Sequence, residues 1–325
     1  MTMIGLCLLL FALASIAQPT AALVSVSRIW DHGAHNAFTD LIRWRDRWYC
    51  TFREGDDHVG GDGRLRVLVS VDGRAWTSAA LIGEPGIDLR DPKLSITSDD
   101  RLMMVAGGSV YEGKRYLGRQ PRVMFSSDGN TWSAPQRILA EGDWLWRVTW
   151  HEGRAYGVTY RNAPGDTSEW TATLVSSADG RTFDHVAALA VPDRPNETTL
   201  RVMPDGEMVA LVRREAGNRF AWIGRSRAPY TTWTWRETPH QIGGPNFIRL
   251  PDGELWASGR SYPGGPKTAI GRLSLDGAYE PALTLPSGGD TSYAGMVWHE
   301  DLLWVSYYAS HEGKTAIYLA RVKVR

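Results

Sequence analysis

Residues able to do chemistry stand at the ends of one predicted β-hairpin. Glu197 opens an apparent strand, a Pro-Asp-Gly turn follows at residues 204–206, and a second apolar strand ends in Arg213 and Arg214. Carboxylate and guanidinium groups are costly to bury unless they are paired or put to use. The hairpin therefore indicates a site where a carboxylate and an arginine could act on a polar ligand.

The same pattern of apolar strand, short polar turn and apolar strand occurs six times. Along the chain, equivalent positions of the copies recur every 47 to 56 residues. The aligned positions are Asp40, Asp91, Arg147, Glu197, Asn246 and Tyr293. A single period sustained over most of the chain is typical of a repeat architecture.

A second motif, Ser-x-Asp-Gly-x-x-aromatic, lies between these hairpins. It occurs at residues 70–76, 126–132 and 177–183, with a degenerate copy at 226–233. Asp-Gly favours a tight turn, and the Ser and Asp side chains can accept hydrogen bonds from nearby backbone amides. We expect this motif to fix a hairpin corner rather than to take part in catalysis.

Six copies of about fifty residues, each long enough for four short strands, predict an all-β, six-bladed β-propeller. Fifteen tryptophans and 34 glycines fit many short strands with tight turns. We expect one domain over residues 23–325. A pair of β-sandwiches is the structural alternative, but it would not explain the period.

In a propeller, the first strand of each blade lines the central channel, so the copies can be superposed. Counted from the turns, Arg53, Arg213 and Arg260 fall at equivalent places at the ends of second strands, where the sixth copy has Tyr308 and the second has Gly107. Three arginines converging on one channel mouth suggest an anion-binding site. The alternative is that they are solvated charges that protect strand edges.

Composition and targeting signals limit the classes of binding partner and the cellular location that we expect. Lys plus Arg and Asp plus Glu each number 36, so there is no basic excess of the kind that indicates nucleic-acid or anionic-membrane binding. The apolar run at residues 4–17 has the length of a signal-peptide core, and we assign residues 1–22 to a signal peptide with cleavage near Ala17 or Ala22. An uncleaved N-terminal anchor is the alternative. We expect a secreted or periplasmic monomer that has no membrane segment after cleavage.

Metal and cofactor sites are not indicated by the sequence. The eight histidines are scattered, and His32 and His35 are the only close pair. No Cys/His grouping with metal-ligand spacing occurs. The Gly-Gly-Asp-Gly stretch at residues 60–63 lacks the Lys-Ser/Thr of a phosphate loop. We therefore expect neither a metal nor another cofactor.

The repeated Ser-x-Asp-Gly-x-x-Trp motifs resemble the Asp boxes of the sialidase (neuraminidase) superfamily, in a form one residue shorter than usual. The stretch from Asn196 to Arg213 is similar to the family segment that holds the catalytic Glu and a substrate-binding Arg. The stretch from Ser292 to Tyr308 is similar to the segment that holds the catalytic Tyr. The resemblance covers essentially all of residues 23–325 and implies an exo-glycosidase with Tyr293 as nucleophile and Glu197 as its base, an exception to the two-carboxylate scheme.

The resemblance also implies an acidic sugar as substrate, held by arginines. Sialic acid carries a carboxylate on its anomeric carbon, which would repel an anionic nucleophile but not a neutral Tyr. Arg53, Arg213 and Arg260 are the candidates for binding that carboxylate. The family's general acid is an Asp on a first-blade loop, and Asp62 is the preferred candidate here. Asp56, Asp57 and His58 in the same loop are alternatives.

One departure from the family pattern weakens the case for sialic acid. The family has Arg-Ile-Pro on its first strand, whereas this chain has Ala37-Phe38-Thr39-Asp40-Leu41 there. Arg90 could replace the lost arginine, or Asp40 and Asp91 could bind hydroxyls of a different sugar. The third arginine could also be Lys267 rather than Arg260.

Three functions remain open from the sequence. The first is a glycoside hydrolase, and the second is a non-catalytic glycan-binding propeller that uses the same pocket. The third is an enzyme for another, uronic-acid-type sugar, including a lyase with Tyr as acid and base. Trp144 and Trp146, before the third inner strand, could form a sugar-stacking platform or belong to the core.

Overall fold

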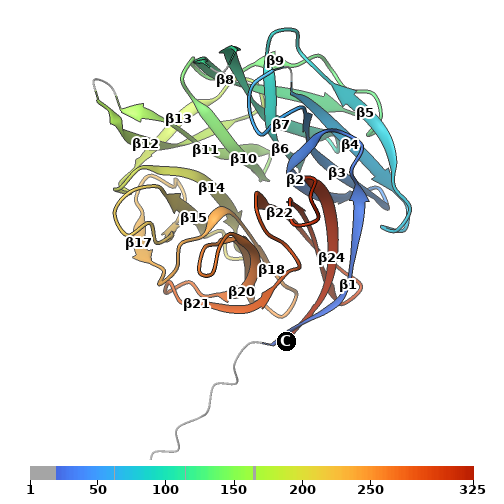
Figure 1. Ribbon diagram of the computed structural model, residues 1–325. Coiled ribbons are helices and arrows are strands. Elements are labelled where there is room, and N and C mark those ends of the chain that lie inside the picture. Colours follow the sequence, from blue (N-terminus) through green and yellow to red (C-terminus); the bar gives the residue numbers. More distant parts are fainter. Residues whose placement is uncertain (1–19, 62, 114, 164–165) are drawn as a thin grey trace, which may run out of the picture.

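A computed structural model describes residues 20–325 apart from residues 62, 114 and 164–165. It contains six four-stranded antiparallel sheets arranged as blades around a centre (Figure 1). The first strand of each blade lies next to the first strands of the neighbouring blades. The predicted six-bladed β-propeller is therefore confirmed.

The strands of each blade follow one another along the chain, except that the last blade takes its outer strand from the N-terminal part. Blade one comprises β2 (His35–Trp44), β3 (Arg47–Gly55), β4 (Arg64–Ser70) and β5 (Thr77–Ile82), and blade two comprises β6 (Asp88–Ile96), β7 (Leu102–Glu112), β8 (Arg115–Ser126) and β9 (Gln136–Arg137). Blade three comprises β10 (Trp144–His151), β11 (Arg154–Ala163), β12 (Asp166–Ser177) and β13 (Asp184–Leu189), and blade four comprises β14 (Pro195–Val202), β15 (Met208–Arg214), β16 (Trp222–Ser226) and β17 (Thr234–Glu237). Blade five comprises β18 (Gly243–Arg249), β19 (Leu255–Ser261), β20 (Lys267–Leu273) and β21 (Tyr279–Thr284), and blade six comprises β22 (Thr291–His299), β23 (Leu302–Ala309), β24 (Ala316–Val324) and β1 (Ala21–Trp30). We number these blades one to six in that order.

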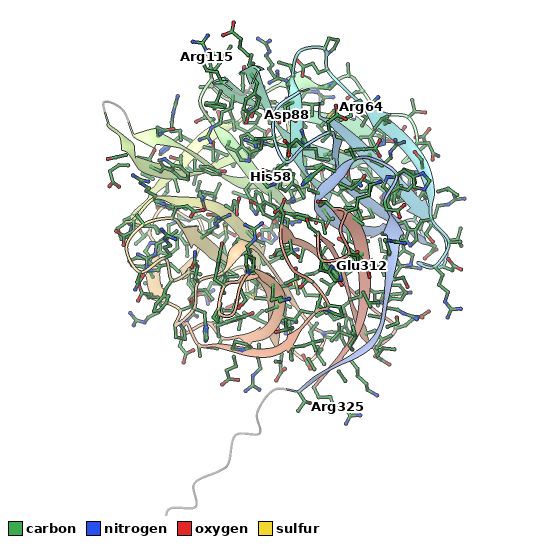
Figure 2. The ribbon with its side chains drawn as sticks, viewed as in Figure 1. His58, Arg64, Asp88, Arg115, Glu312 and Arg325 are labelled. Carbon is green, nitrogen blue, oxygen red and sulfur yellow. The ribbon has the colours of Figure 1, made fainter. Side chains whose placement is uncertain are left out.

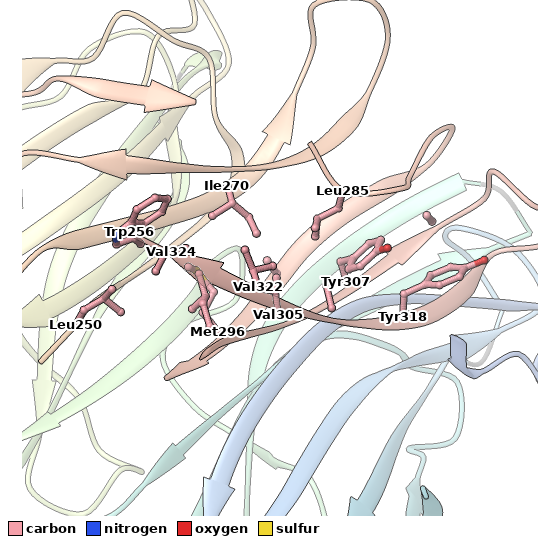
Figure 3. Close-up of a cluster of buried hydrophobic side chains, with 14 of the residues drawn as sticks. Leu250, Trp256, Ile270, Leu285, Met296, Val305, Tyr307, Tyr318, Val322 and Val324 are labelled. Atoms are coloured by element: carbon pink, nitrogen blue, oxygen red, sulfur yellow. The ribbon is translucent and has the colours of Figure 1, made fainter. Parts of the chain in front are cut away.

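Hydrophobic clusters fill the spaces between neighbouring blades. The cluster in Figure 3 joins blade five, through Trp256 and Ile270, to blade six, through Val305, Tyr307 and Val322. Five similar clusters join the other pairs of blades. The inner strands are largely buried although they contain polar and charged residues such as Asn196 and Glu197, so these side chains need partners inside the protein.

The Ser-x-Asp-Gly motifs form turns of one geometry. In the first copy Ser70 Oγ accepts a hydrogen bond from Gly73 N at 2.9 Å, and Asp72 Oδ1 accepts bonds from the amides of residues 74 and 75 at 2.9 and 3.0 Å. The copies that begin at Ser126 and Ser177 repeat these bonds. The turns lie between β4 and β5, β8 and β9, and β12 and β13, where the sequence predicts a structural role.

A β-bulge interrupts each inner strand at the same place. Each first strand has two residues opposite one residue of its partner, and the skipped pairs are residues 38–39, 91–92, 146–147, 196–197, 244–245 and 293–294. Phe38, Asp91, Gly244 and Tyr293 adopt positive φ angles of 66°, 54°, 59° and 53° there. Bulges redirect side chains and are common beside functional sites. Here they turn residues of several blades toward one end of the channel.

Candidate functional site

Tyr293, Glu197 and Arg213 form a hydrogen-bonded group across the channel. The Tyr293 hydroxyl donates to Glu197 Oε1 at 2.6 Å, and Arg213 Nη1 donates to Glu197 Oε2 at 2.5 Å. Gly244 N, on the bulge of blade five, donates to the same Oε2 at 2.9 Å. The bulges of blades four, five and six thus place a base next to a potential nucleophile.

The protonation states in this group follow from burial and from the nearby guanidinium. Burial alone would raise the pKa of Glu197, but the charge of Arg213 and the hydrogen bonds from Tyr293 and Arg213 hold that pKa below its usual value. Burial and the negative charge of Glu197 raise the pKa of Tyr293 well above its usual value. The resting site therefore contains a neutral phenol bound to an ionised carboxylate.

Asp91 contributes a second carboxyl group to the same end of the channel. Asp91 lies on the bulge of blade two and is 8% exposed. Burial raises the pKa of Asp91 and the charge of Glu197 adds to this, while Lys93 and Arg90 oppose it. A buried carboxyl with a raised pKa can hold a proton and donate it.

Lys93 is a site residue that the sequence analysis missed. It lies under the site, with Nζ 4.5 Å from the centroid of the Trp146 ring and 5.6 Å from that of Tyr293. Nζ donates to the carbonyl oxygens of Thr39 and Pro92 at 3.2 Å. Burial lowers the pKa of Lys93 to about 8. The available signal was a lysine two residues after Asp91, on the same predicted inner strand.

Arg260 lies on the other side of Tyr293 and is part of a polar network. Its Cζ is 5.5 Å from the centroid of the Tyr293 ring, and its Nη2 donates to the Tyr308 hydroxyl at 2.9 Å. Tyr308 in turn donates to Asp290 Oδ1 at 2.8 Å. Lys267, the alternative third cation, instead donates to the carbonyl oxygen of Ser287 at 2.6 Å.

Arg53 does not join this group, contrary to the sequence-based expectation. Its side chain is fully buried, and its Nε pairs with Asp88 Oδ1 at 2.7 Å. Its Nη1 and Nη2 donate to the carbonyl oxygens of Asp57 and Gly60 at 2.5 and 3.1 Å. These three bonds hold the Arg53 guanidinium against Asp88 and the β3–β4 loop, so Arg53 anchors that loop.

Asp40 is also used within the protein rather than held open for a sugar hydroxyl. Arg147 Nη1 lies 2.9 Å from both carboxylate oxygens of Asp40, and Leu94 N donates to Oδ2 at 2.7 Å. The exposed fraction of Asp40 is 1%. The charge pair joins the inner strands of blades one, two and three.

The strand register corrects the superposition of the three arginines. Arg53 lies opposite Ala37, Arg260 opposite Gly243, and Arg214 opposite Pro195. Arg214, not Arg213, is therefore the residue of blade four equivalent to the other two. Arg213 faces the bulge instead, and this position brings it to Glu197. Counting from the turns missed that the bulge of blade four lies one residue further from its turn than the bulge of blade five does.

The two tryptophans belong to the core and do not form an exposed sugar platform. Trp144 is 2% exposed and Trp146 is 1% exposed. Arg90 covers the Trp144 ring at 5.0 Å, and its own Nε is buried without a hydrogen-bond partner. Gly107 makes room for Trp144, since a Cβ there would lie 2.0 Å from the indole. Arg90 stays a candidate for the arginine that the first strand lacks, and its charge acts on Asp91.

Asp62, the preferred general acid, lies outside the described residues. The surrounding loop is described, and in it His58 N donates to Asp57 Oδ1 at 2.8 Å. The ring of Phe38 lies between this loop and Tyr293, 5.0 Å from the His58 ring and 5.2 Å from the Tyr293 ring. An aromatic ring thus occupies the region of the first inner strand where the resembling family has an arginine.

The chain matches no protein-family model. A menaquinone reductase of Mycolicibacterium smegmatis is 26% identical over 247 residues, which cover 67% of this chain and 56% of that protein. The chain therefore spans about half the length of that relative. The part of the chain that the structure describes contains no helix long and apolar enough to cross a membrane.

Several solved structures have a fold similar to that of this chain. A protein of unknown function from Dyadobacter fermentans has a TM-score of 0.83 and 21% identity, covering 94% of this chain and 99% of that one. An α-L-arabinofuranosidase of Fusarium graminearum bound to an iminosugar inhibitor has a TM-score of 0.71 and 14% identity, covering 92% and 97%. Trypanosoma rangeli sialidase in complex with the inhibitor DANA has a TM-score of 0.70 and 11% identity, covering 93% and 59%. The chain therefore has the fold of the sialidase-like six-bladed β-propellers.

Proposed function

We propose that the protein is a glycoside hydrolase in which Tyr293 is the nucleophile and Glu197 its base. The observation that carries this proposal is the 2.6 Å hydrogen bond from the Tyr293 hydroxyl to Glu197 Oε1, with Arg213 bound to the other carboxylate oxygen. A nucleophile held within hydrogen-bond reach of a base, which a third group orients, is the arrangement that covalent catalysis requires. Two of the similar solved structures are glycosidases, which agrees with the proposal.

In the first step, the Tyr293 oxygen bonds to the anomeric carbon while the glycosidic C–O bond breaks. The phenolic proton passes to Glu197, and a protonated acid gives its proton to the departing oxygen. In the second step, water attacks the anomeric carbon and the bond to Tyr293 breaks. Glu197 returns its proton to Tyr293, and the ionised acid takes a proton from the water.

Asp91 is the proton donor that the described residues support. It is buried at the same end of the channel as Glu197, and its raised pKa favours the protonated form that an acid needs. Asp62 remains the alternative, because the resemblance implies an acid on its loop. Separate Asp91→Asn and Asp62→Asn variants distinguish them. The true acid's variant should lose far more activity on substrates with poor leaving groups than on activated aryl glycosides.

The charges around Tyr293 support an acidic sugar as substrate. Arg213, Arg260 and Lys93 contact or approach the Tyr293 side chain. Arg90 lies close enough to Asp91 to oppose the rise in its pKa. Arg213 and Arg260 already face acidic groups of the protein, Glu197, Glu215 and Asp290, whereas Lys93 and Arg90 form no salt bridge within the described residues. The charges of Lys93 and Arg90 would therefore favour a negative charge on the sugar.

The test is turnover of a fluorogenic sialoside by the purified protein and by its Tyr293→Phe and Glu197→Gln variants. We expect turnover by the unaltered protein and a loss of about a hundredfold or more in each variant. Tyr318→Phe is a matched control, because Tyr318 donates to Glu312 Oε2 at 2.8 Å away from the channel. Full activity in Tyr293→Phe would disprove the assigned nucleophile.

The aromatic ring of Phe38 favours a second candidate substrate class. Because Phe38 lies where the resembling family has an arginine, the site could take a neutral or uronic-acid sugar instead of sialic acid. A panel of pentosides, hexosides and uronides would identify it. A product that absorbs in the ultraviolet would indicate a lyase, and binding without turnover would indicate a glycan-binding propeller.

A further inference from the structure

Two histidines and an aspartate that are far apart in the sequence meet at the rim of the site. His35 begins β2, His58 lies in the β3–β4 loop, and Asp290 immediately precedes β22. Asp290 Oδ2 is 3.3 Å from His35 Nε2 and 2.5 Å from His58 Nδ1. Figure 2 shows His58 toward the middle of the ring of blades. The cluster joins blade one to blade six.

We propose that His35, His58 and Asp290 form a binding site for one divalent transition-metal ion of the Zn²⁺ type. Their three ligand atoms lie within 4.8 Å of one another. Ligand atoms about 2.0–2.2 Å from a tetrahedral Zn²⁺ are about 3.3 Å apart. The His35–Asp290 distance already has this value. A shift of the partly exposed His58 ring that brings its Nδ1 to the same distance from both other ligand atoms would complete the site.

The surroundings hold the ligands in place. Tyr308 donates to Asp290 Oδ1 at 2.8 Å and leaves Oδ2 directed at the two imidazoles. Arg53 binds the carbonyl oxygens of Asp57 and Gly60, on both sides of His58. Such outer contacts orient the ligands of metal sites. They also give the buried Arg53 a function, since it fixes the loop that carries His58.

The site would be open and of moderate affinity. Three protein ligands leave at least one coordination position for an oxygen atom of water or substrate. Arg260 Nη2, 3.5 Å from Asp290 Oδ1, adds a positive charge that opposes a divalent cation. The ring of Phe38 contacts both His58 and Tyr293, so a bound ion would lie about one aromatic ring away from Tyr293.

The experiment is a titration of tag-free, EDTA-treated protein with Co²⁺, followed by visible absorption and by competition with Zn²⁺. We expect one saturable Co²⁺ site that Zn²⁺ displaces. His58→Ala and Asp290→Asn should each weaken binding at least tenfold. His32→Ala is the matched control, since His32 lies in the same segment but stacks on Trp30 at 4.2 Å and is outside the cluster. It should bind as the unaltered protein does.

Three results would overturn the proposal: no saturable Co²⁺ spectrum, equal binding by His58→Ala, or an equal loss in His32→Ala. His58 is about half exposed in a loop, so its variant should fold, and circular dichroism checks this. The measurement needs no substrate. A protein that binds Co²⁺ but hydrolyses nothing would support the metal site and count against the proposed hydrolase.

Discussion

Glu197 is ionised in a place where burial favours the neutral form. Its charge is balanced by Arg213 and by hydrogen bonds from the Tyr293 hydroxyl and Gly244 N. Arg213 is held in turn by an ion pair with Glu215. At this scale the site is a set of mutually dependent charges, and removal of one partner leaves another buried without compensation.

Replacement of Arg213 tests this dependence. Arg213→Met should lower the free energy of unfolding by about 3–5 kcal/mol, because the buried Glu197 carboxylate loses its cation. In the Arg213→Met, Glu197→Gln double variant the loss should be smaller than the sum of the single losses. Urea unfolding measures both. Arg227→Met is the control in the same blade. Both side chains of the Arg227–Asp205 pair are more than half exposed, so this substitution should lower the free energy of unfolding far less than Arg213→Met does.

The lowered pKa of Glu197 predicts how stability depends on pH. A carboxyl whose folded pKa lies below its unfolded value, 4.5 for Glu, stabilises the fold fully above pH 4.5. That contribution is lost as pH falls through the folded pKa. The stability advantage of the unaltered protein over Glu197→Gln should therefore shrink below pH 4.5. Urea unfolding of both proteins from pH 7 to pH 3 measures this, and a constant difference would contradict it.

The Ser-x-Asp-Gly turns act at the scale of whole elements, because each turn rests on the preceding blade. A Cβ on Gly73 would lie 2.5 Å from Trp304 of blade six, and a Cβ on Gly129 would lie 2.3 Å from Tyr49 of blade one. Gly180 similarly approaches Met103 of blade two. The motif therefore fixes a hairpin corner and also packs one blade against the next.

Gly129→Ala isolates this packing. Gly129 and Gly153 have φ angles of 78° and 77°, but a Cβ on Gly153 would meet no atom within 4 Å. Both substitutions carry the cost of a left-handed alanine, about 1–2 kcal/mol. Gly129→Ala should cost about 1–3 kcal/mol more, because it also displaces Tyr49. Equal losses in denaturant unfolding would show that the contact between blades contributes nothing.

At the scale of the whole molecule, β1 closes the ring. It pairs with β24 from Ala21 opposite Val324 to Trp30 opposite Ile317, and Thr20 and Arg325 exchange two backbone hydrogen bonds. Blade six is thus made from both ends of the described chain. Of the two predicted cleavage regions, the one near Ala17 would keep all of this pairing, whereas cleavage after Ala22 would remove its first residues.

Truncation tests the closure. Compared with a chain that begins at residue 20, a chain that begins at residue 31 should melt about 10 °C or more lower. The reason is that β24 becomes an unpaired edge and Trp30 no longer donates to Glu54 at 3.0 Å. Circular dichroism during heating measures the midpoint. An unchanged midpoint would mean that three strands suffice for blade six.

The architecture could be predicted from the sequence alone, because the strands and turns of a propeller blade produce patterns among residues that are close in the sequence. Each blade needs alternating strands and turns at a fixed period, and both are visible in neighbouring residues. It also singled out Tyr293, Glu197 and Arg213, through a resemblance that covers the hairpins of blades four and six. These residues stand at strand ends, where the propeller geometry predicts the channel mouth.

Only the tertiary structure decided the partners of the buried charges. Arg53 pairs with Asp88, Asp40 with Arg147, and Asp290 with His35 and His58, and each pair joins segments at least 30 residues apart. Local spacing cannot encode such contacts, since they depend on how the blades are arranged around the channel. The position of the bulge acts in the same way. In blade four it lies one residue further from the turn than in blade five, which makes Arg214 the equivalent of Arg260 and leaves Arg213 opposite the bulge, where it donates to Glu197.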